Sequence, residues 1–304
     1  MSKLKFDFGI ETHEFMSEIF EKNFKYFPNA LNSREYTWEM LNSDFHNINP
    51  VTGNMIIYKN GIQNHRSYSN SFEDFDKQIR YDFDENKLHT LLNDGATIVV
   101  NGFDKSSITI NALCHKLSVM TNFSTVANAY ITKGGSGTFG KHWDTHCVFA
   151  TQIKGSKLWR IYKPTLDLPL PFQTSSQEKE FFNKDPVFEI VINEGDVLYI
   201  PRGWWHVANP IQNIPSVHIS FGIHTPKLFN YIKWVLEKKM SQDIDFRRSI
   251  NSDHLINKEA INLALNKITN SLSSIEIFEE FNREASKISI KTREINIENL
   301  LKAY

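Results

Sequence analysis

The stretch that decides the chemistry of this chain is His142-Trp-Asp144-Thr-His-Cys-Val-Phe-Ala-Thr-Gln152, which is followed further along by Gly203-Trp-Trp-His206. On an extended strand, side chains two residues apart project from the same face, so His142 and Asp144 are expected to point in one direction. His206, arriving from a distant turn, would complete a triangle of two imidazoles and one carboxylate. This ligand set, with its opposite face open, suits non-haem iron(II). The pattern therefore predicts a metal site at these three residues.

The sequence around this pattern predicts a β-rich fold. Short runs of β-branched and aromatic residues between Gly- and Pro-containing turns are typical of a closed or nearly closed β-sandwich barrel. A first strand is expected at 96–100, between Asp-Gly and Asn-Gly, and a helix is expected at 107–120. The other barrel strands are expected at 126–132, 147–154, 157–163, 187–192, 197–201, 205–209 and 216–224.

Helical patterns flank the barrel on both sides. Residues 1–91 are expected to mix helices with short strands, including a helical stripe at 14–24, a short helix at 37–41 and a strand at 54–58 that enters an Asn-Gly turn. From Pro226 onward the apolar spacing predicts helices at 228–240, 259–272 and 275–285.

Five motifs follow one another in a fixed order across the β-rich region. They are Asn128-Ala-Tyr130, a glycine-rich turn at 134–140, His142-Trp-Asp144, Val148-Phe-Ala-Thr-Gln152-Ile-Lys-Gly155-Ser-Lys157-Leu-Trp159, and Gly195-Asp196-Val-Leu-Tyr-Ile-Pro201-Arg-Gly203-Trp-Trp-His206. In this order and at this spacing they resemble the metal-binding core of the JmjC oxygenases, most closely the ribosomal-oxygenase (cupin-4) branch. The resemblance covers about residues 92–224.

The resemblance implies a mostly β fold with helices. We expect a double-stranded β-helix (jelly roll, cupin) JmjC barrel with N-terminal α/β elements and a C-terminal helical region. Residues 1–225 would form the catalytic domain and 226–304 the helical region. In the ribosomal oxygenases a helical dimerisation region and then a winged-helix module follow the barrel. The residues after 225 have room for the first and not for both, which leaves a ribosomal-protein substrate open.

Lys157 shares its strand parity with Trp159 and Ile161, which we expect inside the barrel. A buried lysine without a partner is costly, so an inward Lys157 implies a bound anion. The resemblance assigns this position to the distal carboxylate of 2-oxoglutarate. It also aligns Asn128 and Tyr130 with polar residues that line the cosubstrate pocket. Ser216, on the last barrel strand, is a further candidate of the same kind.

His146 leaves one alternative open. It has the same strand parity as His142 and Asp144, so it could add a ligand and give the closed four-coordinate site of structural zinc. The resemblance places no ligand at this position. We therefore expect an open site with three protein ligands.

The expected activity is that of an Fe(II)/2-oxoglutarate-dependent dioxygenase that uses O2 to hydroxylate a side chain of a protein or peptide. A ribosomal protein and a biosynthetic precursor peptide are both candidate substrates. The alternatives are an RNA (tRNA) hydroxylase, a lysine demethylase of the JmjC class, and a catalytically silent cupin-like binding protein. Intact His142, Asp144, Lys157 and His206 argue against the silent protein.

Composition narrows the setting of this activity. A net charge of −1 argues against a protein that coats nucleic acid. Two cysteines give no disulfide framework, and with no apolar leader or membrane span in view, a cytoplasmic location is expected. The apolar stripe at 228–240 must be buried, either against the barrel or in an interface, and in the related oxygenases helices in this position build a two-fold interface. We therefore expect a homodimer.

Overall fold

The computed structural model describes residues 4–51, 53–135, 137, 139–177, 185–250 and 254–289. The chain forms two compact units that divide after His224. The first unit is built on a nine-stranded sheet with the strand order β1-β9-β7-β11-β6-β5-β2, and β8 and β10 pair with β7 off this path. The strands are β1 (Lys25–Phe27), β2 (Met55–Tyr58), β5 (Thr97–Val100), β6 (Ser124–Thr132), β7 (Cys147–Tyr162), β8 (Phe188–Asn193), β9 (Val197–Ile200), β10 (Trp205–Pro210) and β11 (Ser216–His224).

Strand β7 connects the two halves of the barrel. Its first half pairs with β9 and β11, while its second half, from Ser156 onward, pairs with β8 and β10. The change of partners occurs at Gly155, whose φ of +65° is unfavourable for other residues. A Cβ at this position would lie 1.8 Å from the carbonyl oxygen of Pro215. The expectation of two strands, 147–154 and 157–163, joined by a turn is therefore wrong: they form one strand that bends at a glycine.

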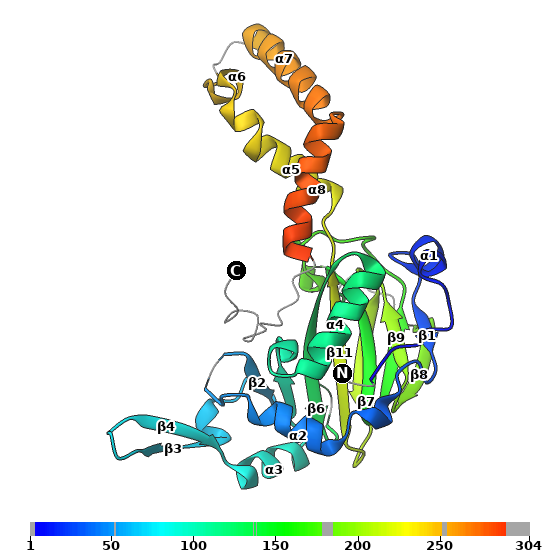
Figure 1. Cartoon of the computed structure of the whole chain (residues 1–304), viewed down its shortest axis with the longest axis vertical. Helices are drawn as coiled ribbons and strands as arrows, with labels where there is room; N and C mark the ends of the chain where they lie inside the picture. Colours follow the sequence, from blue (N-terminus) through cyan, green and yellow to red (C-terminus); the bar gives the residue numbers. More distant parts are fainter. Residues whose placement is uncertain are drawn as a thin grey trace, which may run out of the picture. The chain divides into compact units, whose positions relative to one another are not determined.

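Alternation along β7 separates two apolar clusters. Phe149 and Ile153 face the larger cluster, together with buried residues of α4 (Ile108–Thr121) and of the N-terminal segment. Val148 and Ala150 face the inside of the barrel, together with Trp159 and Ile161 from the bent half of the strand. Helix α4 begins at its cap, where the Ser107 hydroxyl accepts from the amide of Ile110. It lies along β6 in Figure 1.

The N-terminal elements differ from the sequence-based expectation. In place of a helix at 14–24, a short α1 (Thr12–Glu14) runs into a π-helical turn at Phe15–Ile19. This turn brings Phe15 and Phe20 to the same side, where both contact Tyr199 at centroid distances of 5.0 and 6.2 Å. Helix α2 (Trp38–His46) is longer than expected. The hairpin β3 (Ser69–Glu73)–β4 (Ile79–Phe83) and helix α3 (Glu85–Asn93) were not predicted.

The second unit is helical. It contains α5 (Leu228–Lys238), a 3-10 turn at Met240–Gln242, α6 (Ile244–Arg247), α7 (His254–Leu272) and α8 (Ile275–Ser289). Tyr231, Val235 and Met240 form its core together with Phe281 of α8. Within the described part of the chain, every helix is too short or too polar to cross a membrane.

Candidate functional site

A backbone bridge brings the two predicted histidine ligands together. The amide of His142 donates to the carbonyl of His206 at 3.1 Å, and the amide of His206 donates back at 2.8 Å. The two ring centroids are consequently 4.4 Å apart. Asp144 follows two residues later, and its Oδ2 lies 3.6 Å from Nε2 of His206. One ligand atom from each of the three residues lies within 4.8 Å of the others, and no other such group of His, Cys, Asp or Glu occurs among the residues described.

The hydrogen bonds of the two imidazoles fix which nitrogen faces the cluster. Nδ1 of His142 lies 3.0 Å from the carbonyl oxygen of Gly140, and Nδ1 of His206 lies 3.0 Å from that of Trp204. A carbonyl oxygen only accepts, so Nδ1 carries the proton in both rings. In the neutral form of each ring, Nε2 then has its lone pair for a metal, which is the tautomer that backbone carbonyls commonly impose on metal-binding histidines.

The charges of the triad also suit a metal. Burial, reinforced by neighbouring His142, lowers the pKa of His206 to about 4, so its ring is neutral near pH 7. Burial opposes ionisation of Asp144, yet the surrounding imidazoles, His206 foremost, hold the pKa of its carboxyl below the usual value. A neutral imidazole and an ionised carboxylate are the forms that bind metals. The donor set therefore fits a divalent cation with an open coordination face.

His146 lies outside this cluster. Near the triad, His142 makes only a single β-bridge, and β7 begins at Cys147. The residues between them are not in a strand, so the alternation of strand side chains does not place His146 on the same face as His142 and Asp144. Its ring stacks on His224 at 4.7 Å and lies so close to Gly222 that a Cβ there would be 2.7 Å from the ring. The four-ligand zinc alternative thus lacks its fourth ligand in this arrangement.

The triad opens into a cavity of about 630 Å³ that follows the inward face of β11. The lining residues on this strand are His218, Ser220, Gly222 and His224, which alternate as one face of a strand should. His218 is 4% exposed, whereas His224 is exposed. The cavity thus has a closed end at His218 and an open end at His224.

Lys157 occupies the closed end. It is 3% exposed, and its Nζ lies 3.3 Å from Nδ1 of His218. Burial lowers the pKa of Lys157 to about 7, and within the described part of the chain no carboxylate offsets this effect. Burial, with a further contribution from Lys157, also lowers the pKa of His218 well below its usual value. A buried lysine without an acidic partner is the receptor expected for an anionic ligand.

The other predicted cosubstrate residues are only partly brought together. Tyr130 lines the cavity and stacks on His218 at 4.6 Å with the rings nearly parallel. Asn128 also lines it, with Oδ1 accepting from the amide of Gly102 at 2.9 Å. Ser216 does not line the cavity: it is fully buried beyond the closed end, where its Oγ accepts from Gln152 Nε2 at 2.9 Å.

Sequence reasoning missed part of the cavity wall. For His218 the sequence left open a structural role, a substrate contact or an approach to the cosubstrate end of the pocket, and in the structure it is the direct contact of Lys157. The strand alternation that placed Lys157 inside could have found it. The cavity is also lined by Phe139 and by residues 171 and 173–175, which lie outside the strands and carry no periodic signal.

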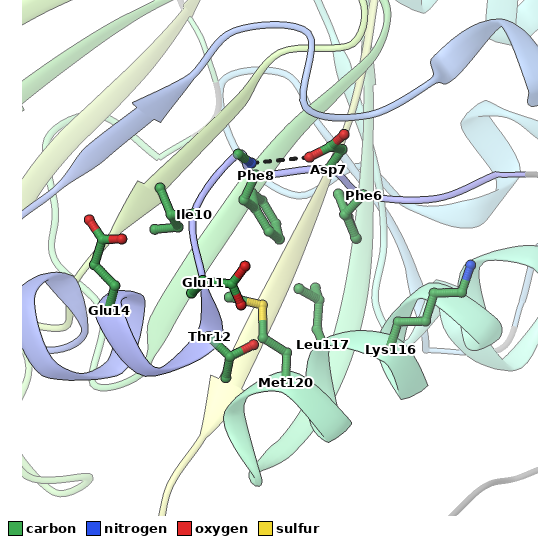
Figure 2. A pocket seen from close by; sticks show the side chains of 11 residues that line it. Phe6, Asp7, Phe8, Ile10, Glu11, Thr12, Glu14, Lys116, Leu117 and Met120 are labelled. Atoms are coloured by element: carbon green, nitrogen blue, oxygen red, sulfur yellow. Dashed lines mark hydrogen bonds between the residues drawn. The ribbon is translucent and has the colours of Figure 1, made fainter.

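A second cavity, of about 520 Å³, lies between residues 6–14 and helix α4 (Figure 2). Glu11 and Glu14 are exposed on one side, and Lys116 on the other donates to the carbonyl of Leu4 at 3.0 Å. Asp7 accepts from the amide of Gly9 at 3.1 Å. This cavity contains no cluster of three metal-ligating side chains, so we place the candidate site at the triad.

Comparison with known proteins identifies similar chains. Residues 106–231 match the family model of the JmjC domain. The histidyl-hydroxylase NO66 of Caenorhabditis briggsae, named a bifunctional lysine-specific demethylase and histidyl-hydroxylase, is 37% identical over 111 residues, which is 36% of this chain and 14% of that protein. Human ribosomal oxygenase 1 is 30% identical over 138 residues, 42% of this chain and 21% of that protein. The chain thus aligns with less than a quarter of either relative's length.

Solved structures show the same fold. The ribosomal oxygenase YcfD of Escherichia coli has a TM-score of 0.58 at 15% identity, covering 90% of this chain and 69% of that one. YcfD in complex with cobalt and 2-oxoglutarate has a TM-score of 0.57 at 14% identity, with 93% and 72% covered. The expected fold, a JmjC/cupin barrel with a helical C-terminal region, is confirmed.

Proposed function

Because residues 106–231 form a JmjC domain, we propose that this chain is an Fe(II)/2-oxoglutarate-dependent dioxygenase that hydroxylates a side chain of a protein or peptide. One observation carries the proposal. A metal-competent triad that retains an open face and a buried lysine without an acidic partner line the same cavity. A dicarboxylate that binds a metal at one end and a cation at the other would use both features.

In this proposal each residue of the chain has a defined task. His142, Asp144 and His206 hold iron through Nε2, a carboxylate oxygen and Nε2. Lys157 binds the distal carboxylate of 2-oxoglutarate, while Tyr130 and Asn128 shape the wall beside it. When bound, iron and 2-oxoglutarate together supply the O2 activation that the side chains cannot provide. Ser216 is proposed to support the closed end through Gln152 and not to touch the cosubstrate.

A protein or peptide substrate is supported by the names of the relatives, which are called ribosomal oxygenase and histidyl-hydroxylase. The chain's net charge of −1 weighs against an RNA substrate, since RNA binding draws on clustered positive charge. We also propose a cytoplasmic setting, where iron(II) is more easily kept reduced.

The test is an intact-mass screen of candidate peptides and ribosomal proteins with the protein, iron(II), 2-oxoglutarate and ascorbate. We expect a gain of one oxygen atom on the substrate together with succinate formation. The same reaction with a Lys157→Met variant is the matched control and should give neither. Loss of a methyl group from a methyl-lysine peptide would assign demethylation instead. Absence of any metal- and 2-oxoglutarate-dependent turnover would contradict the proposal.

We further propose that residues 1–225 are the catalytic domain and that the helical region from 226 supplies a homodimer interface. Tyr231 and Val235 of α5 are covered within the helical unit, but Leu228, Phe229 and Leu236 remain 73%, 44% and 39% exposed. An apolar patch of this kind is typical of a protein contact. Light scattering should give about twice the chain mass of 35.4 kDa. Leu228→Asp with Phe229→Asp should reduce it to one chain, and a monomeric wild type would disprove the interface.

A further inference from the structure

The hairpin β3–β4 extends away from the barrel as an arm, defined here as residues 69–83 (Figure 1). Its strands pair with each other and form a sheet separate from the barrel. An isolated two-stranded hairpin is marginally stable, so its position depends on its base. Lys87 of α3 donates there to the carbonyl of Ser69 at 3.0 Å and to Oδ1 of Asn70 at 2.7 Å, and Asn70 donates to Asp84 at 2.9 Å. Helix α3 and its cap residue Asp84 therefore hold the arm by its base, and most of the other arm residues are exposed.

The exposed part of the arm is apolar at three places. Phe75, in the turn, is fully exposed, while Phe72 and Ile79 are 49% and 55% exposed. Phe72 pairs with Arg80 and Ile79 with Glu73, so the two apolar side chains lie on opposite faces of the hairpin. A hairpin that ended in solvent would gain nothing from large apolar groups on both faces and at the tip. Their grouping is typical of a protein contact that surrounds the tip.

The charges of the arm indicate the sign of its partner. Glu73, Asp74, Asp76 and Asp82 are balanced only by Lys77 and Arg80. Asp74 is already used, since it pairs with Nε of Arg80 at 2.8 Å. Glu73, Asp76 and Asp82 are exposed, and these three acidic side chains outnumber Lys77, the one basic side chain of the arm that remains. Apolar groups surrounded by excess negative charge are complementary to a basic protein surface with apolar side chains, and they disfavour nucleic acid and anionic lipid.

Ring contacts connect the base of the arm to the wall of the cavity that the triad lines. Tyr81 of β4 contacts His65 at 5.5 Å, in the segment that follows β2. Tyr58 of β2 contacts Phe139 at 5.2 Å, and Phe139 lines the cavity. The arm and this cavity wall are therefore attached to the same edge of the sheet.

We propose that the arm is a docking surface for a basic protein, and that this protein presents the side chain that enters the cavity. The identity of the docked protein as substrate rests on the proposed function, whereas the docking does not. Phe72, Phe75 and Ile79 would contact apolar side chains of the partner. Glu73, Asp76 and Asp82 would raise the association rate and make binding depend on ionic strength.

The experiment measures binding of the full chain to two labelled probes, one basic and one acidic ribosomal protein of similar size, by fluorescence anisotropy. We expect the basic probe to bind, and Phe72→Ser with Phe75→Ser to weaken this binding at least tenfold. Asp76→Lys with Asp82→Lys should weaken it as strongly at low salt and reduce its salt dependence. The matched control is Ile108→Ser with Val119→Ser on α4, whose side chains are 80% and 61% exposed, and it should bind like the wild type.

Three results would overturn the proposal. The arm variants could bind the basic probe as tightly as the wild type does, or the wild type could bind the acidic probe as tightly as the basic one. The third result is an oligomeric mass of the arm variants that differs from that of the wild type. The last result would assign the arm to a second copy of the chain. Thermal stabilisation by Mn(II) and 2-oxoglutarate, measured in parallel, should be the same in the arm variants and the wild type. A wild type that docks the basic probe and never hydroxylates any substrate would refute the proposed function and leave the docking intact.

Discussion

Replacing Asp144 with alanine is expected to remove metal binding and all 2-oxoglutarate turnover, and His142→Ala and His206→Ala should do the same. Each residue contributes one of three ligand atoms that lie within 4.8 Å of one another. Loss of residues that merely orient metal ligands costs about 10–100-fold in affinity, so loss of a ligand should exceed about 100-fold. Asp144 has the largest expected effect, because without its charge the cation faces only neutral imidazoles.

Equilibrium dialysis with Mn(II) or Co(II), followed by elemental analysis, measures this loss without requiring activity. The matched control is His146→Ala, which removes an imidazole only two residues from Asp144. Because His146 lies against Gly222 and His224, this variant should keep wild-type metal affinity. If His146→Ala loses the metal while Asp144→Ala retains it, the assignment of the triad is wrong.

The sequence could predict that His142, Asp144 and His206 come together, because the contacts that decide this are local or pairwise. His142 and Asp144 are two residues apart, and the Gly203-Trp-Trp-His206 turn returns His206 to them through one backbone bridge. Strand alternation was misleading for His146, two residues after Asp144. It assigned His146 to the same face, but the chain is not in a strand between the bridge at His142 and the start of β7.

Lys157 and Ser216 show where strand alternation is sufficient and where it is not. Alternation placed Lys157 inside the barrel, and it is buried there. Ser216 has the same parity as His218 on β11, yet it lies opposite Gly155, where β7 bends and the cavity has already closed. The position of a bend depends on contacts such as that of Gly155 with Pro215, which residue alternation alone does not reveal.

Only one strand of the β3–β4 arm carries an apolar strand pattern. In β4, Ile79, Tyr81 and Phe83 alternate with Arg80 and Asp82, whereas β3 is polar at every position except Phe72, so a pair of strands was not recognised from the sequence. The N-terminal π turn was missed for a different reason. Apolar residues at 15, 16, 19 and 20 fit an α-helical stripe, and only packing of Phe15 and Phe20 on Tyr199 selects the wider turn.

Replacing Lys157 with methionine is expected to have opposite effects on cosubstrate binding and on stability. Removing one partner of a buried ion pair costs about 3–5 kcal/mol, which would raise the dissociation constant of 2-oxoglutarate by roughly two to four orders of magnitude. In the ligand-free protein, however, burial lowers the pKa of Lys157 to about 7 from a usual value of 10.5. Between these two pH values the unfolded chain binds a proton that the folded chain does not, so folding stability rises with pH across this window. At neutral pH the lysine therefore destabilises the free protein, and Lys157→Met should raise its melting temperature.

The same pKa shift sets the pH dependence of cosubstrate binding. Below about pH 7 the free protein already holds Lys157 as an ammonium, and affinity for the dianion should be at its highest. As the pH rises above about 7, binding must restore the lost proton, so affinity should fall by up to about tenfold per pH unit. Titration calorimetry with Mn(II)-loaded protein measures this slope. The pH range should run from about 6 to about 9, which is roughly one unit below and two units above the shifted pKa of Lys157. Lys157→Met should bind weakly with no such slope, and Lys157→Arg should recover part of the affinity without it, because arginine stays charged. A Lys157→Met variant that binds 2-oxoglutarate as tightly as the wild type would show that the distal carboxylate is held elsewhere.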